Sequence, residues 1–290
     1  MSYNPTNVYD HDPHIAEIYD LSETYHNDVN LLLALLSPMS AFIGGNGGTE
    51  GGRVFRILEP FCGTGRILIP LAQAGHAMVG LDQAGDMLDR ARQKLACLPS
   101  DVQSRVTLHQ ADVITAEWPS GFDLIILGGN CLFELATPKE QEHVIRSAAV
   151  ALNPGGYIYV DNDHMEGDLD PSWQQPGIKP GFPSGVCSDG TKVESTIETI
   201  WFDIPTRLAR FRCTTRINLP GSGGTEHRST SGKVVHVEYI QQKHPVSAVE
   251  VQAWLERYGF IIEQVFGDRT GSPYTPASDR AIFWARKPSG

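Results

Sequence analysis

The stretch that decides the fold is FRILEPFCGTGRILIPLAQAGHAMVGLD, residues 55–82. It opens with a run suited to a buried strand and breaks at Gly63, Thr64 and Gly65. It then resumes as an apolar helical pattern and ends in a second short strand at Asp82. A glycine turn between a strand and a helix lets a ligand approach the backbone and directs the first amides of the helix toward it. The stretch therefore predicts a ligand-binding α/β unit.

The segments that follow keep the same alternation. Helical patterns cover residues 84–98 and 138–152, and strand patterns cover residues 105–112, 122–129 and 157–162. Short connections between alternating strands and helices predict a parallel sheet with helices on both faces, that is, a doubly wound Rossmann-like α/β fold.

Two further regions are expected outside this core. Asp12 and Pro13 are a good helix start, so the N-terminal segment predicts one or two helices. A Pro/Gly-rich excursion from residue 167 precedes three alternating segments typical of antiparallel strands. The expected domains are an N-terminal helical cap (1–43), a Rossmann-like domain (53–166 and 244–290) and an inserted antiparallel β lid (167–243).

Composition narrows the classes of function. The chain has 290 residues and a formal net charge of −11, which argues against nucleic acid as a partner because that binding needs clustered Lys and Arg. No run is long enough to span a membrane, and the N-terminus lacks the layout of a signal peptide, so a cytoplasmic protein acting on a small molecule is expected. Five scattered cysteines without a C-x-x-C pair predict reduced thiols and no metal site. Edge strands of the lid could pair two subunits as a homodimer.

A nicotinamide or flavin dinucleotide is the first ligand to consider at the glycine turn. Its fingerprint requires a third glycine three positions after the second, and Leu68 stands there, so a pyrophosphate is disfavoured. An adenosine-like ligand without a phosphate remains. Asp82 could accept hydrogen bonds from both ribose hydroxyls, and Asp112 could accept one from an exocyclic amine. Glu59 ends the first strand, so three acids are expected to point into one crevice.

These motifs resemble a known family. LEPFCGTGRILIPLAQAGHAMVGLDQAGDMLDRAR (residues 58–92), followed in order by HQAD (109–112) and FDLIILGGNCLFEL (122–135), is similar to the class I S-adenosylmethionine-dependent methyltransferases. The resemblance implies S-adenosylmethionine as the cofactor. It places the cofactor-binding residues at Tyr19, Glu59, Gly63, Gly65, Asp82, Gln83, Met87, Asp112, Val113, Gly128 and Gly129.

The rest of the chain resembles a narrower group, glycine N-methyltransferase and the antibiotic-sugar N,N-dimethyltransferases. That group has tyrosine-bearing N-terminal helices over the cofactor, here implying Tyr9, Tyr19 and Tyr25, and a small antiparallel sheet after the fifth strand. VDNDHMEG (160–167) belongs to neither kind, so the acceptor is not carried over. The resemblance favours methyl transfer to nitrogen of a small molecule. Transfer to oxygen or carbon of a carboxylate-bearing metabolite, and cofactor binding without catalysis, are the alternatives.

Methyl transfer from a sulfonium requires the acceptor and the methyl group to be held in line, away from water. A neutral amine can attack unaided, whereas an aliphatic hydroxyl needs a base. His164 is the candidate base, although it could instead be a loop histidine bonded to the backbone. Asn130 could orient the acceptor atom, and Tyr25 is the third catalytic candidate. His236 and Tyr239 are candidate substrate contacts that face opposite ways, so at most one can reach the site.

Arg212 is the remaining candidate for substrate binding. Strand alternation places it on one face with Arg210 and Arg216. If that face covers the pocket, the acceptor carries a carboxylate or a phosphate, which arginine can bind with two hydrogen bonds. The alternative is cross-strand pairing with Glu194 and Glu198.

Overall fold

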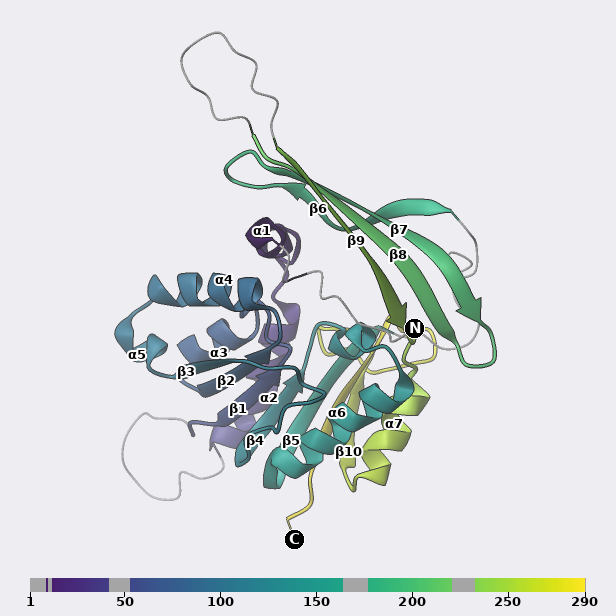
Figure 1. The fold of residues 1–290 in the computed structure, drawn as a ribbon. Coiled ribbons are helices and arrows are strands. Elements are labelled where there is room, and N and C mark those ends of the chain that lie inside the picture. The colour runs from purple at the N-terminus through teal and green to yellow at the C-terminus, as the bar shows by residue number, and fades with distance from the viewer. Residues whose placement is uncertain (1–8, 10–11, 42–52, 164–176, 221–232, 290) are drawn as a thin grey trace.

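The computed structural model describes residues 9, 12–41, 53–163, 177–220 and 233–289. A seven-stranded mixed sheet with helices on both faces forms the body of the protein, and a separate four-stranded antiparallel sheet stands beside it (Figure 1). The strand order of the larger sheet is β10-β11-β5-β4-β1-β2-β3.

The larger sheet confirms the predicted doubly wound core with one difference. Its strands are β1 (Arg56–Pro60), β2 (Ala77–Asp82), β3 (Val106–Gln110), β4 (Phe122–Leu127), β5 (Leu152–Asp163), β10 (Ile261–Phe266) and β11 (Arg280–Arg286). The first five strands pair in parallel, but β11 runs antiparallel to both of its neighbours, β5 and β10. The sheet is therefore mixed rather than parallel throughout.

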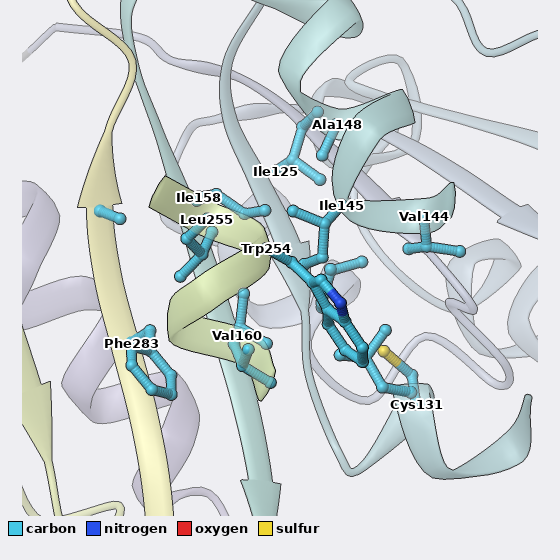
Figure 2. Packing of buried hydrophobic residues seen from close by; sticks show 14 of the residues in the cluster. Ile125, Cys131, Val144, Ile145, Ala148, Ile158, Val160, Trp254, Leu255 and Phe283 are labelled. Atoms are coloured by element: carbon cyan, nitrogen blue, oxygen red, sulfur yellow. The ribbon is translucent and has the colours of Figure 1, made fainter. Parts of the chain in front are cut away.

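Helices cover the two faces of this sheet in two groups. The helical elements are α1 (Pro13–Ser22), α2 (Asn27–Ala41), α3 (Leu68–Gln73), α4 (Gly85–Ala96), α5 (Ser100–Gln103), the 3₁₀ turn η2 (Cys131–Glu134), α6 (Pro138–Ala151) and α7 (Ala248–Arg257). Side chains of α6 and α7 share one buried cluster with β4 and β5, whereas those of α2, α3 and α4 share the other. Figure 2 shows Trp254 and Leu255 of α7 beside Ile158 and Val160 of β5.

Three helix starts follow the capping residues in the sequence. The side chain of Asp12 accepts a hydrogen bond from the backbone N–H of His14 at the start of α1, as expected of an N-cap aspartate. Thr137 accepts one from the N–H of Glu140 at the start of α6. Ser247 forms a complete capping box at the start of α7.

The smaller sheet has four strands where three were predicted. They are β6 (Ile178–Val186), β7 (Lys192–Asp203), β8 (Leu208–Asn218) and β9 (Val234–Lys243), in that order across the sheet. The unpredicted strand, β6, lies in the segment read as a Pro/Gly-rich excursion. Its position at the edge explains why Pro180 and Pro183 are tolerated, since an edge strand has only one neighbour that needs hydrogen bonds.

The fifth strand also begins earlier than expected. The sequence pattern predicts a strand at 157–162, but β5 starts at Leu152 directly after α6 and includes residues 153–156. The pairing with β4 shifts register in this part of the strand, and Gly155 adopts a positive φ of 79° there.

The N-terminal segment forms two helices, and α1 lies between α4 and the smaller sheet (Figure 1). No helix in the described ranges is long and apolar enough to cross a membrane.

Candidate functional site

A cavity of about 380 Å³ opens beyond the carboxyl ends of β1, β2 and β4, and we call it the first cavity. Most of the residues predicted to bind the cofactor line it together, although they are far apart in the sequence. They are Tyr19, Glu59, Gly63, Asp82, Gln83, Met87, Asp112, Val113, Gly128 and Gly129. The smaller sheet closes one side of it, because Ile240 and Gln241 of β9 also line this cavity.

Gly65 is the predicted cofactor residue that does not appear in this lining. Its φ of +77° lies in the left-handed region, and a Cβ added there would sit 3.1 Å from the side chain of Ile69. Gly65 therefore shapes the turn and the start of α3 rather than forming the wall. Gly128 allows a second close approach, since a Cβ at that position would lie 2.6 Å from Cδ1 of Ile67.

The carboxylate of Asp82 is fixed by the backbone on both sides. Its Oδ2 accepts a hydrogen bond of 2.8 Å from the N–H of Gly63, and its Oδ1 accepts one of 2.9 Å from the N–H of Ala84. Gly63 has a φ of +50°, so the glycine turn and the acid at the end of β2 hold each other in place. A carboxylate can accept more than two hydrogen bonds, which leaves Asp82 able to bind ligand hydroxyls.

Asp112 lies after β3 and is set in a similar way. Its Oδ1 accepts from the N–H of Ile114 at 2.9 Å, and its Oδ2 accepts from Oγ1 of Thr115 at 3.1 Å. Both of these partners also line the first cavity. The side chain is therefore placed at the cavity rim, where it can accept from a ligand amine.

Glu59 is buried at the end of β1 with an exposed fraction of 5%. Burial raises the pKa of its carboxyl to about 8, and nearby Arg66 opposes the rise. Among the described residues, none supplies a hydrogen bond to Oε2 of Glu59. An orphaned buried acceptor facing the cavity fits the ammonium of S-adenosylmethionine, and the glycine turn leaves room for the rest of that molecule.

The raised pKa of Glu59 predicts a pH dependence of stability. The folded protein retains the Glu59 proton up to about pH 8, whereas the unfolded chain loses it near the ordinary carboxyl pKa. The stability that Glu59 contributes is therefore fully present at low pH and is lost as pH rises toward the folded-state pKa. We expect the free energy of unfolding of the ligand-free protein to fall by up to about 1.4 kcal/mol per pH unit in this window, relative to Glu59→Gln. Urea titrations of both proteins at about pH 5.5 and about pH 7.5 measure the difference. If the free energy of unfolding changed equally with pH in the two proteins, the raised pKa of Glu59 would be contradicted.

Helix α1 is anchored over the first cavity by a cluster of charges. Oδ1 of Asp20 accepts from Thr64 Oγ1 at 2.6 Å and from Lys94 Nζ at 2.9 Å, and Oδ2 accepts from Arg90 Nε at 2.9 Å. The neighbouring residue, Tyr19, lines the cavity and makes an edge-to-face contact with Tyr9 at 6.2 Å between ring centroids.

A second cavity of about 350 Å³ lies between the inner face of the smaller sheet and η2. It shares Tyr9, Glu134 and Gln241 with the first cavity, so the two spaces meet at these side chains. Aromatic rings form much of its wall, from Tyr9, Phe133, Phe182, Phe211 and Tyr239. The second cavity is therefore a suitable place for an acceptor beside the cofactor.

Glu134, which lies at this junction, was not a sequence candidate. Its Oε1 lies 3.2 Å from Nζ of Lys243, and its Oε2 accepts from Nε2 of Gln241 at 3.2 Å. The ammonium of Lys243 also lies 4.1 Å from the ring centroid of Phe133. Only the packing of β9 against η2 brings these residues together, although Glu134 stands within the NCLFEL phrase after β4.

The two catalytic candidates that the structure describes, Asn130 and Tyr25, lie outside both cavities. Asn130 has a positive φ of 62°, and its side chain donates to Oδ2 of Asp163 at 2.7 Å and accepts from Arg280 at 2.6 Å. Its amide thus joins η2 to β5 and β11, and neither Asn130 nor Tyr25 appears in the cavity linings. The ring of Tyr25 contacts the guanidinium groups of Arg66 and Arg269, whose Cζ atoms lie 4.4 Å and 4.3 Å from its centroid. His164 lies outside the described residues.

Two of the substrate candidates face away from the cavities. Arg212 lies on the exposed face of the smaller sheet, where its Nη1 donates to Glu198 at 2.7 Å. The cross-strand alternative is therefore correct for Arg212, and the basic face does not cover the pocket. His236 lies on the same exposed face, paired in register with Arg216. Tyr239 faces inward and lines the second cavity.

Comparison with known proteins agrees with this geometry. Residues 57–156 match a family model described as a methyltransferase domain, and no curated protein matches the chain. A solved S-adenosylmethionine-dependent methyltransferase from Clostridium acetobutylicum ATCC 824 is similar in fold, with a TM-score of 0.66 at 13% identity over 95% of this chain and 98% of that one.

Two further solved structures share the fold. The sugar N-methyltransferase KedS8 from Streptoalloteichus sp ATCC 53650 gives a TM-score of 0.63 at 18% identity, covering 99% of both chains. CalS10, an amino pentose methyltransferase from Micromonospora echinaspora, gives 0.60 at 17% identity, covering 98% of this chain and 100% of that one. The matched region contains the glycine turn and the acids that end β1 and β2, so residues 57–156 are similar to a methyltransferase domain, and the chain as a whole shares the fold of these solved methyltransferases.

Proposed function

We propose that the protein methylates a nitrogen atom of a small molecule that carries an amine and binds in the second cavity. The observation that carries this proposal is Glu134, a carboxylate shared by both cavities at the point where they meet. A carboxylate there attracts a protonated amine and orients it toward the first cavity. The similarity in fold to a sugar N-methyltransferase and to an amino pentose methyltransferase supports the same choice.

The protein's own contribution is to bind and orient the two reactants. S-adenosylmethionine supplies the electrophilic methyl group. The aromatic side chains of the second cavity pack against the acceptor and exclude water, and Glu134 holds the amine. The amine loses its proton to solvent before it attacks the methyl group, so the protein does not need to supply a general base. Transfer to oxygen or carbon, and cofactor binding without catalysis, are the outcomes that the following test separates from this one.

The test compares matched acceptors. S-adenosylhomocysteine release is measured with a panel of small amines and with the alcohols in which a hydroxyl replaces the amine. We expect turnover with amines, and we expect Glu134→Gln to lower kcat/KM by about 10- to 100-fold while leaving the Kd for S-adenosylhomocysteine unchanged, because one charge-assisted hydrogen bond to the acceptor is weakened.

Glu238→Gln is the matched control. Glu238 lies on β9, the strand whose Gln241 and Lys243 contact Glu134, but its side chain is 65% exposed on the outer face near Arg212, so its replacement should leave kcat/KM unchanged. Preference for the alcohols would indicate an O-methyltransferase. If Glu134→Gln and Glu238→Gln had equal effects on kcat/KM, Glu134 would not bind the acceptor. If none of the acceptors in the panel led to release of S-adenosylhomocysteine, the non-catalytic alternative would be favoured.

A further inference from the structure

Lys243, at the end of β9, lies beside the carboxylate at which the two cavities meet. Its Nζ is 3.2 Å from Oε1 of Glu134 and 4.1 Å from the ring centroid of Phe133. The side chain of Lys243 is only 9% exposed, and it lines the second cavity. The carboxylate and the face of the ring both attract an ammonium group. A fixed positive charge therefore borders the proposed acceptor site.

Strand β9 holds this pair in position against η2. Nε2 of Gln241 donates to Oε2 of Glu134 at 3.2 Å. Nε2 of Gln242 donates to the backbone oxygen of Ala136 at 3.2 Å. Glu134 can still bind a further donor, because a carboxylate accepts more than two hydrogen bonds. An acceptor amine that bonds to Glu134 therefore lies close to the ammonium of Lys243.

The other ionisable groups around this pair leave Lys243 as its cation. The remaining titratable side chains of the second cavity, and those of η2 and α6 that line the first, are Tyr9, Cys131, Glu140, Lys179, Cys213 and Tyr239. Burial raises the pKa of both tyrosines and both cysteines, so these groups stay neutral near neutral pH. Oε2 of Glu140 accepts from the N–H of Ala136 at 2.8 Å, and Lys179 lies on β6, at the opposite edge of the smaller sheet from β9.

A carboxylate without a neighbouring cation would hold an acceptor amine in the wrong state for methyl transfer. It favours the ammonium form, which has no lone pair with which to attack the methyl carbon. A cation beside the same carboxylate opposes this effect, because like charges disfavour protonation of the amine. The neutral amine can still donate a hydrogen bond to Glu134, and Lys243 does not repel it.

We propose that Lys243 causes the acceptor amine to bind at Glu134 in its neutral form, with the nitrogen lone pair free to attack. The amine gives one proton to solvent on binding. The nitrogen then forms a bond to the methyl carbon as the carbon–sulfur bond breaks, and the electron pair of that bond remains on sulfur. Lys243 stays protonated throughout and is a positioning residue. This inference rests on the proposed acceptor site at Glu134.

Lys243→Met removes the charge and keeps most of the length of the side chain. With a panel amine that is turned over, we expect a lower KM and a roughly 10-fold lower kcat at neutral pH, because the amine then binds as the ammonium. The pH profile of kcat should move upward by about one unit, so that kcat recovers at higher pH. Lys243→Arg keeps the charge and should keep the wild-type profile.

Proton release on binding gives a second readout that does not depend on turnover. The same amine is titrated calorimetrically into protein saturated with S-adenosylhomocysteine, in buffers of different ionisation enthalpy. We expect release of about one proton per bound amine from the wild-type complex and almost none from Lys243→Met. Lys192→Met, at a 57% exposed lysine of β7 that pairs with Glu194, is the control and should change neither measurement.

Two results would overturn the inference about Lys243. One is a pH profile of kcat that does not move in Lys243→Met, and the other is an absence of proton release when the amine binds to the wild-type complex. If Glu134→Gln lowers kcat/KM while Lys243→Met behaves as the wild type, the acceptor site stands and only the role of Lys243 is wrong. If no panel amine is turned over, the proposed function fails together with this inference.

Discussion

Replacing Asp161 with alanine is expected to lower the free energy of unfolding by about 3–5 kcal/mol. Asp161 is fully buried on β5, where Oδ2 accepts from Nε of Arg269 at 2.8 Å and Oδ1 accepts from Nε of Arg280 at 2.7 Å. Removing this carboxylate leaves two mostly buried guanidinium groups without their shared counter-charge. The cost is large because these cations cannot return to bulk water while the fold persists.

Urea unfolding at neutral pH measures this loss, with Glu263→Ala as the matched control. Glu263 pairs with Arg286 at 2.6 Å, but both side chains are about one-third exposed, so its removal should cost no more than about 1 kcal/mol. If the two substitutions had similar effects, the buried network would not be the element that joins β5, β11 and the loop that carries Arg269.

Replacing Asp82 with alanine is expected to weaken S-adenosylhomocysteine binding by about 2–3 kcal/mol, or roughly 30- to 150-fold. The change removes the acceptor available to the ribose hydroxyls, and it also frees the N–H groups of Gly63 and Ala84 that Asp82 now binds. The loss should therefore exceed that of a single ligand contact, because the glycine turn is no longer held in its positive-φ conformation.

Calorimetry of Asp82→Ala beside Asp89→Ala checks this expectation. Asp89 is an exposed acid on α4 that pairs with Arg92, so its removal leaves the first cavity intact. An affinity of the Asp82 variant equal to that of the Asp89 variant would exclude Asp82 from cofactor binding.

The local patterns that could be read from the sequence are those in which neighbouring residues decide the structure. The glycine turn, the helix start at Asp12, and the apolar strands each depend on a few adjacent positions. Parallel topology then brings the ends of successive strands to one edge, which is why Glu59, Asp82 and Asp112 could be expected at one cavity.

Predictions failed where a residue's environment comes from a distant segment. Strand alternation correctly separated Arg212 from Phe211, but it could not say which face of the sheet would meet the body of the protein. Asn130 follows β4 as expected, yet its side chain bonds to Asp163 and Arg280, residues much later in the chain. The edge strand β6 was missed because its prolines contradict the usual strand composition.

The sequence by itself determined the doubly wound core, the glycine turn and the acids that border the first cavity, because hydrophobic periodicity and turn chemistry act over short distances. Only the tertiary structure decided that β9 meets η2 at Glu134 and that Asp28 and Tyr25 hold Arg66. Those contacts join segments that approach one another only when the sheets and helices have packed, and no local pattern encodes them.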